Sequence, residues 1–197
     1  KLDGFVRIDT ERNTLAVENA LAELLLADKP PKAIINVGVH RTIDKLIQLA
    51  HRSDYRPLFL SISFSSDPLP LESSTLPADI IVTQVVPNPH ESKLPIVQEY
   101  LTNLKLFDSS LQPSFWSLEG YIAAKVLILK LQELPPPITR QALIDSFNQS
   151  GMLDIGLGYP LLFGPDRVQA TDHVWPMLLS HGRYRSFDWK QLHSLLS

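Results

Sequence analysis

The sequence predicts an α/β fold, and three features of the chain carry that prediction. Residues 31–67 contain two short apolar runs, 33–37 and 58–62, on either side of a stretch with helical periodicity. A third apolar run at 80–86 extends the alternation of strands and helices. The chain has 197 residues, 44% of them hydrophobic and 20% charged, which is ordinary for a globular protein of one domain or two small ones.

The first two elements precede this unit. Residues 4–9 alternate between apolar and polar side chains, which predicts a strand. A helix follows, because apolar residues recur at helical spacing from Val17 to Leu24. We expect Asn13 or Thr14 to cap this helix, and the prolines that begin at Pro30 to end it.

The stretch 31–67 reads as strand, helix, strand. Thr42 is expected to cap the helix, whose apolar residues fall at i, i+3, i+4 and i+7: Ile43, Leu46, Ile47 and Ala50. Elements of these lengths form a βαβ unit with parallel strands. In open parallel sheets, ligands bind just beyond the carboxyl ends of the strands. Those ends are Gly38–Arg41 and Ser61–Ser66, so a small ligand is expected there.

Residues 87–90 break the pattern and are a candidate crossover between two lobes. Three helices are predicted after it, at 92–106, 115–134 and 139–150, and Thr139 caps the last. The helix at 115–134 has almost no polar face, so we expect it to be buried on several sides. The remaining predicted elements are strands at 159–163, 174–179 and 183–187, and a short helix opened by Asp188 and Gln191 as a capping box.

Composition excludes several classes of function. The formal net charge of −3 gives no electrostatic case for nucleic acid, and no apolar window is long enough for a membrane span. The absence of cysteine excludes disulfides, thiol catalysis and cysteine-based zinc sites. The six histidines are scattered and phosphate-binding glycine motifs are missing, so no metal and no cofactor is expected. Lys1 opens directly into folded-looking sequence, so no signal peptide is expected.

The candidate ligand-binding residues are Val39, His40, Ser63, Phe64 and Glu119. His40 follows a strand at the start of a helix, where backbone amides favour anionic groups, although it could equally be an exposed turn histidine. Ser63 and its neighbours could donate hydrogen bonds to a polar ligand or could cap a loop. Phe64 could be a stacking wall or part of the core. Glu119 could line a site or simply favour the helix dipole in a first turn.

Seven short motifs follow one another along the chain: Glu11-Arg12-Asn13-Thr14, Val37-Gly38-Val39-His40-Arg41, Pro57-Leu58-Phe59-Leu60-Ser61-Ile62-Ser63-Phe64, Ile81-Val82-Thr83-Gln84-Val85-Val86-Pro87, Ser117-Leu118-Glu119-Gly120-Tyr121-Ile122-Ala123-Ala124, Thr139-Arg140-Gln141-Ala142-Leu143-Ile144 and Phe163-Gly164-Pro165-Asp166. This ordered series resembles type I periplasmic binding proteins, in the branch of the leucine/isoleucine/valine-binding proteins of ABC transporters. No motif is specific alone, but the family's order is kept over nearly the whole chain.

The resemblance implies a non-catalytic, extracytoplasmic protein with two lobes that closes on a small ligand for a membrane transporter. Residues 1–87 then form the carboxy-terminal lobe, a three-layer parallel-sheet lobe without its first strand and helix. Residues 88–197 form a returning segment whose helices and strands are shared between the lobes. His40 stands where relatives often place a tyrosine that lines the cleft.

Two departures from the family pattern shape the expected ligand and partner. Ser63 stands near the position of a carboxylate that holds a ligand's ammonium group in amino-acid binders, so a carboxylate or aromatic acid is the expected substitute for an amino acid. The resemblance also implies an amino-terminal lobe that precedes this stretch. Its missing first strand would lie between the strands at 4–9 and 33–37. We therefore expect either a fragment of a longer protein or a second chain that fills the gap.

Other readings of the sequence stay open. The same module serves as the ligand-sensing domain of membrane receptors, so a receptor is the first alternative. An α/β hydrolytic enzyme is the second, and it would need Ser63 as nucleophile and His40 as base. A protein-interaction module is the third, because uncovered helix faces could form a protein interface.

Overall fold

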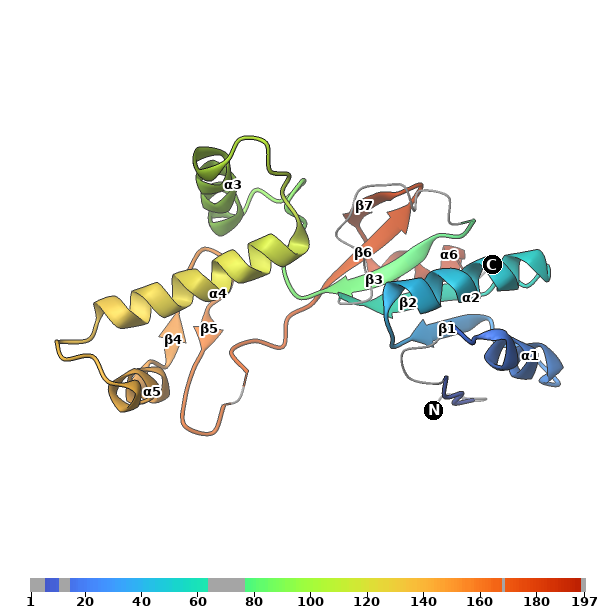
Figure 1. Ribbon diagram of the computed structural model, residues 1–197, viewed down its shortest axis with the longest axis horizontal. Coiled ribbons are helices and arrows are strands. Elements are labelled where there is room, and N and C mark those ends of the chain that lie inside the picture. Colours follow the sequence, from blue (N-terminus) through green and yellow to red (C-terminus); the bar gives the residue numbers. More distant parts are fainter. Residues whose placement is uncertain (1–5, 11–14, 64–76, 168, 196–197) are drawn as a thin grey trace. The chain divides into compact units, whose positions relative to one another are not determined.

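The computed structural model describes residues 6–10, 15–63, 77–167 and 169–195 of the chain (Figure 1). They belong to two compact units. Unit 1 comprises residues Lys1–Gln84 and Trp175–Ser197, and unit 2 comprises Val85–Val174. The chain therefore leaves unit 1 after its third strand and returns to it with its last two strands. Each unit is described by itself below.

Unit 1 is built on a five-stranded mixed sheet in the order β1-β2-β3-β6-β7. The first three strands pair in parallel and the last two pair antiparallel, which confirms the predicted α/β class and the parallel βαβ unit. The register places Ala33 opposite Leu58 and Phe59 opposite Ile80. The strands are β1 (Ala33–Asn36), β2 (Leu58–Ile62), β3 (Ile80–Gln84), β6 (Trp175–Ser180) and β7 (Arg183–Ser186).

Helices cover both faces of this sheet, so unit 1 has three layers. Helices α1 (Glu18–Leu26) and α2 (His40–Arg52) pack on one face. Their contacts form the larger core cluster: Val17, Leu21, Ile43, Leu46, Ile47, Ala50, Phe59, Ile80 and Val82. The short elements η2 (Trp189–Gln191) and α6 (Leu192–Leu195) follow β7, and α6 covers part of the other face. The buried residues of that smaller cluster are Leu58, Ile81, Leu178 and Phe187.

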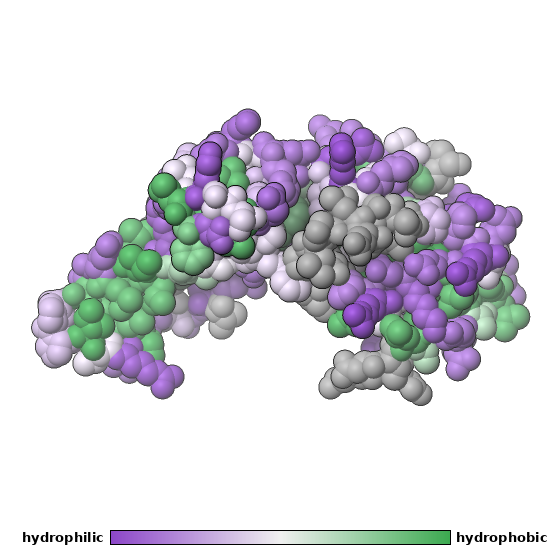
Figure 2. Space-filling view, turned by 45° about the horizontal axis from the view of Figure 1, so that its top comes forward, coloured by the Kyte–Doolittle hydropathy of each residue, from purple (hydrophilic) through white to green (hydrophobic). Residues whose placement is uncertain are grey.

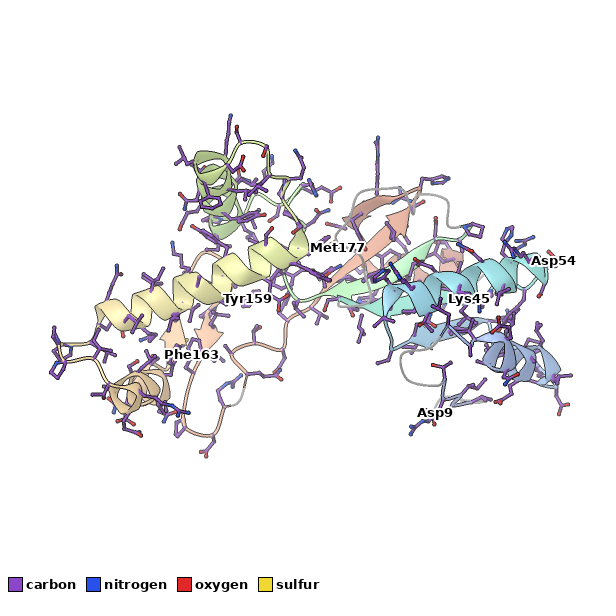
Figure 3. The ribbon with its side chains drawn as sticks, viewed as in Figure 1. Asp9, Lys45, Asp54, Tyr159, Phe163 and Met177 are labelled. Atoms are coloured by element: carbon purple, nitrogen blue, oxygen red, sulfur yellow. The ribbon has the colours of Figure 1, made fainter. Side chains whose placement is uncertain are left out.

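Lys45, labelled in Figure 3, connects α2 to α1, the two helices that cover the same face of the sheet. Its ammonium group, on α2, lies 2.6 Å from a carboxylate oxygen of Glu18 on α1. It also donates a hydrogen bond of 2.5 Å to the carbonyl oxygen of Leu15, just before α1. This contact fixes the start of α1 over the second helix.

Unit 2 is mainly helical, with a small two-stranded sheet. Its elements are α3 (Pro95–Phe107), α4 (Phe115–Gln132), α5 (Arg140–Gln149), β4 (Met152–Leu153) and β5 (Leu161–Leu162). The predicted cap of α5 is confirmed, because the Thr139 hydroxyl accepts a hydrogen bond from the Ala142 amide at 3.1 Å. Aromatic rings of Phe147 and Phe163 meet at a centroid distance of 5.2 Å, so α5 packs beside β5.

A polar network joins α3 to α4. The Tyr121 hydroxyl donates to Glu99 Oε1 at 2.6 Å, and Lys125 Nζ lies 2.5 Å from the same oxygen. Asn103 Nδ2 donates to the Tyr121 hydroxyl oxygen at 2.7 Å. These contacts lower the pKa of the Glu99 carboxyl, with the Lys125 hydrogen bond as the largest cause. The two helices are therefore held by charge-assisted hydrogen bonds as well as by packing.

Three expectations from the sequence are wrong. Helix α2 begins at His40 with Val39 as N-cap, so Thr42 is not its cap. Of the expected strand at 4–9, the described residues 6–9 form no strand. Helix α4 is not buried on several sides: only Phe115, Leu118, Val126 and Lys130 are buried.

Helix α4 carries several exposed apolar side chains, whose exposed fractions are 50% for Trp116, 42% for Leu127 and 53% for Ile128. Figure 2 shows a hydrophobic (green) patch at the left, over unit 2, to which α4 belongs. The expected caps Asn13 and Thr14 of α1 lie outside the described residues. Among the helices that the structure describes, none has the length and apolar character that a membrane crossing requires.

Candidate ligand-binding site

The carboxyl ends of β1 and β2 lie side by side in unit 1. Asn36, the last residue of β1, is opposite Ser61 of β2 in the register. Both are buried, with exposed fractions of 8% and 6%. Side chains alternate along a strand, so Ser61 points to the same face as Phe59, which is the face that α2 covers. Two buried polar side chains thus lie at the edge where parallel sheets bind ligands.

Asn36 has a hydrogen-bond partner, whereas the hydroxyl of Ser61 has none. Asn36 Nδ2 donates to the carbonyl oxygen of Leu60 at 3.3 Å. Thr83 Oγ1 donates to the carbonyl oxygen of Ser61 at 3.4 Å. The Ser61 hydroxyl itself has no hydrogen-bond partner. A buried hydroxyl normally has a partner, so this one is available to a bound polar group.

The start of α2 contributes the second part of the site. Val39 is extended, with φ −79° and ψ 149°, and its carbonyl oxygen accepts from the amides of Thr42 and Ile43. No side chain caps this end, and the first turn carries no acidic residue but has His40 and Arg41. The positive end of the helix dipole, with these two residues beside it, favours a negatively charged group.

The structure brings three of the five predicted site residues to one edge of unit 1. Val39, at 48% exposure, and the half-buried His40 begin α2, while the half-buried Ser63 follows β2 directly. Glu119 lies on α4 in unit 2 and is exposed. Phe64 lies outside the described residues.

Sequence reasoning selected the loop serines and missed Asn36. The signal was present, because a single polar residue ends the apolar run 33–36. Ser61 is one of the strand-end serines that the sequence offers as hydrogen-bond donors to a polar ligand. The arrangement offers hydroxyl, amide and helix N-terminal donors, which suit binding of a carboxylate.

A cavity of about 210 Å³ lies elsewhere in unit 1, at the amino-terminal ends of β2 and β3. It is lined by residues of several segments, among them Ile47, His51, Tyr55, Arg56 and Asp79. Burial raises the pKa of the Tyr55 hydroxyl, which donates to the carbonyl oxygen of Pro31 at 2.6 Å. No group of three or more metal-ligating side chains gathers anywhere in the described part of the chain.

Comparison with known proteins places the fold. No protein-family model matches the chain, and no curated protein matches it significantly. A solved structure, a possible leucine/isoleucine/valine-binding protein from Rhodopirellula baltica, is 36% identical with a TM-score of 0.83. The match covers 93% of this chain and 50% of that protein.

Two further solved structures are more distant and support the fold alone. An extracellular ligand-binding receptor from Verminephrobacter eiseniae is 18% identical with a TM-score of 0.66, over 86% of this chain and 48% of that one. A leucine-binding protein from Thermotoga maritima is 14% identical with a TM-score of 0.71, over 89% and 49%. The chain thus spans about half the length of the solved proteins it matches, and it carries the type I periplasmic binding protein fold of the leucine/isoleucine/valine-binding proteins.

Proposed function

We propose that this chain is the ligand-binding half of an extracytoplasmic solute-binding protein that performs no catalysis. It captures a small polar ligand, an amino acid or another carboxylate, for an ABC transporter. The observation that carries the proposal is the match to the Rhodopirellula baltica protein, at 36% identity over 93% of this chain. The remaining half of the relatives' length is supplied by a longer form of the same protein or by a second chain.

The chemistry at the strand ends supports an anionic ligand. A carboxylate at the start of α2 would face the positive end of the helix dipole, with His40 and Arg41 in the first turn. The hydroxyls of Ser61 and Ser63 would donate to its oxygens or to another polar group of the ligand. A serine at position 63 cannot neutralise an ammonium group. An aromatic acid or a simple carboxylate therefore fits this edge better than an α-amino acid does.

The proposal is tested by thermal unfolding with a panel of amino acids, aromatic acids and small carboxylates. The protein is isolated under non-denaturing conditions from its own organism, so that any associated polypeptide stays with it. A ligand at 100 times its Kd stabilises the native state by about 2.7 kcal/mol. We expect one chemical class to raise the melting temperature, and the carboxylates to be that class.

Variants locate the site. His40→Ala and Ser63→Ala should abolish the shift in melting temperature, whereas His51→Ala should preserve it. His51 is the matched control because it lies near the other end of α2 and lines the separate cavity. No shift from any class would contradict the proposal. Loss of the shift in His51→Ala alone would move the ligand to that cavity.

A ligand-sensing domain of a membrane receptor is the second candidate. The likeness to an extracellular ligand-binding receptor favours it, although that likeness is in the fold alone. The two candidates differ in what the complete gene encodes. A membrane-spanning segment followed by a kinase or cyclase would favour the receptor, and neighbouring genes for a transporter would favour solute uptake.

A further inference from the structure

The cavity of about 210 Å³ in unit 1 lies at the end of the sheet opposite to the candidate site. Leu58 and Phe59 open β2, and Asp79 directly precedes β3, so the lining gathers at the amino-terminal ends of two parallel strands. Ile47 reaches the cavity from the α2 face of the sheet, and Leu195 reaches it from the α6 face. The cavity therefore passes around the end of the sheet.

The walls of this cavity are largely apolar. Ile47 and Phe59 are 0% and 1% exposed, and Leu58 is also buried. A water molecule occupies roughly 30 Å³, so the cavity has the volume of about seven waters. It therefore suits a compact molecule of about that many non-hydrogen atoms. Binding sites for small molecules combine such apolar walls with a few polar groups.

Asp79 is the acidic side chain of the lining, and it is half-buried. No hydrogen bond or ion pair with another described residue engages its carboxylate. Arg56 also lines the cavity, but its guanidinium group pairs with Asp54, which is outside the lining, at 2.8 Å. A half-buried carboxylate without a partner is unfavourable, so a cation in the cavity would be stabilised beside Asp79.

The cation that fits this lining is organic. A metal ion needs several ligating side chains, and no group of three or more gathers in the described part of the chain. An ammonium group needs acceptors only. Besides Asp79, the Tyr55 hydroxyl oxygen can accept, because its own proton is donated to the carbonyl oxygen of Pro31 at 2.6 Å. The ring of His51, also in the lining, accepts when it is neutral.

We propose that this cavity is a second binding site, which takes a small organic ammonium ion with a compact apolar body. The ammonium group lies at the carboxylate of Asp79, and the apolar body lies against Ile47, Phe59 and Leu195. The proposal does not rest on the proposed function, because the cavity is at the other end of the sheet and its ligand has the opposite charge.

The test is isothermal titration calorimetry of the protein, prepared as for the ligand panel, in a buffer that contains no amine. Cyclohexylamine is the probe, because it joins a compact apolar ring to an amine that is protonated at neutral pH. Cyclohexanol is the matched neutral compound. We expect cyclohexylamine to bind at least about tenfold more tightly than cyclohexanol, because hydrogen bonds to a charged group are stronger than neutral ones.

A pair of variants separates the role of this carboxylate from that of net charge. Asp79→Asn keeps the size of the side chain and should weaken cyclohexylamine binding at least about tenfold. The control is Glu23→Gln, at an exposed acid of α1 outside the lining, and it should leave the affinity within about twofold. Asp79→Asn should also keep or raise the melting temperature, because its carboxylate has no partner to lose.

Several results would overturn the proposal. They are equal binding of the two compounds, an unchanged affinity in Asp79→Asn, an equal loss in Glu23→Gln, and a lower melting temperature in Asp79→Asn, which would reveal a structural partner. Loss of cyclohexylamine binding in His40→Ala would place the amine at the start of α2 and overturn it too. Amine binding without a response to the ligand panel would leave the cavity site standing and refute the proposed function, and the converse would do the reverse.

Discussion

Two isoleucines of unit 1 have opposite surroundings, and replacing each by valine compares them directly. Ile47 of α2 is 0% exposed in the larger core cluster, whereas Ile35 of β1 is 70% exposed. The substitution removes one methylene in each case and keeps a β-branched side chain. The difference between the two variants therefore reports how well each side chain is covered.

The expected magnitudes follow from burial. A fully buried methylene contributes about 0.8 kcal/mol, and Ile→Val substitutions in cores cost about 0.5–1.5 kcal/mol. At Ile35 only about three tenths of the side chain is covered, so the same methylene contributes roughly 0.2 kcal/mol. Ile47→Val should thus lower the free energy of unfolding by about 0.6 kcal/mol more than Ile35→Val does.

Urea unfolding followed by tryptophan fluorescence measures this difference. The three tryptophans are Trp116, Trp175 and Trp189, and only Trp116 lies in unit 2. A Trp116→Phe background therefore reports unit 1 alone. With a urea dependence of about 1–3 kcal/mol per molar, the two midpoints should differ by roughly 0.2–0.6 M. Equal midpoints would refute the reasoning, because they would mean that the chain itself covers Ile35.

Two other predictions concern unit 2. Gly156→Ala should destabilise unit 2 by roughly 1–3 kcal/mol, because φ of Gly156 is +84° and the new Cβ would lie 2.9 Å from Pro95 Cβ. Gly120→Ala should stabilise α4 by about 0.5–1 kcal/mol, because no atom lies within 4 Å of the new Cβ. Thermal unfolding of both variants checks this pair of predictions, and equal effects would contradict it. The lowered pKa of Glu99 predicts stability that is complete above its ordinary value of 4.5 and lost as the pH falls below it. Glu99→Gln should flatten this pH dependence in thermal melts taken down to about pH 3, and an unchanged profile would count against the network.

The local patterns of unit 1 were sufficient to predict its parallel core. The apolar runs at 33–36 and 58–62, with helical spacing from Ile43 to Ala50 between them, have only one common arrangement. The cap of α5 was equally local, since the Thr139 hydroxyl needs only the amide three residues later. The elements that were predicted wrongly depend on tertiary contacts, which a local sequence pattern does not show. An alternating segment such as residues 6–9 becomes a strand only when a neighbouring strand is present.

In the candidate site, too, some features follow from local sequence and others depend on tertiary contacts. Val39, His40 and Ser63 were accessible to sequence reasoning because a strand end is a local feature. Asn36 has a local signal as a polar residue in an apolar run, but the sequence of either strand does not state that it lies opposite Ser61 in the register. The apolar residues of α4 predict burial, but a sequence pattern does not say which faces of a helix other elements cover. Trp116, Leu127 and Ile128 of α4 are in fact exposed.

The unsatisfied hydroxyl of Ser61 has a consequence for selectivity. A buried polar group without a partner costs roughly 1–3 kcal/mol, and that cost is present before any ligand arrives. A ligand that accepts a hydrogen bond from Ser61 recovers this free energy, whereas an analogue of the same shape with a methyl group there does not. At 1.4 kcal/mol for each factor of ten, discrimination between two such compounds reaches about 5- to 150-fold from one oxygen atom.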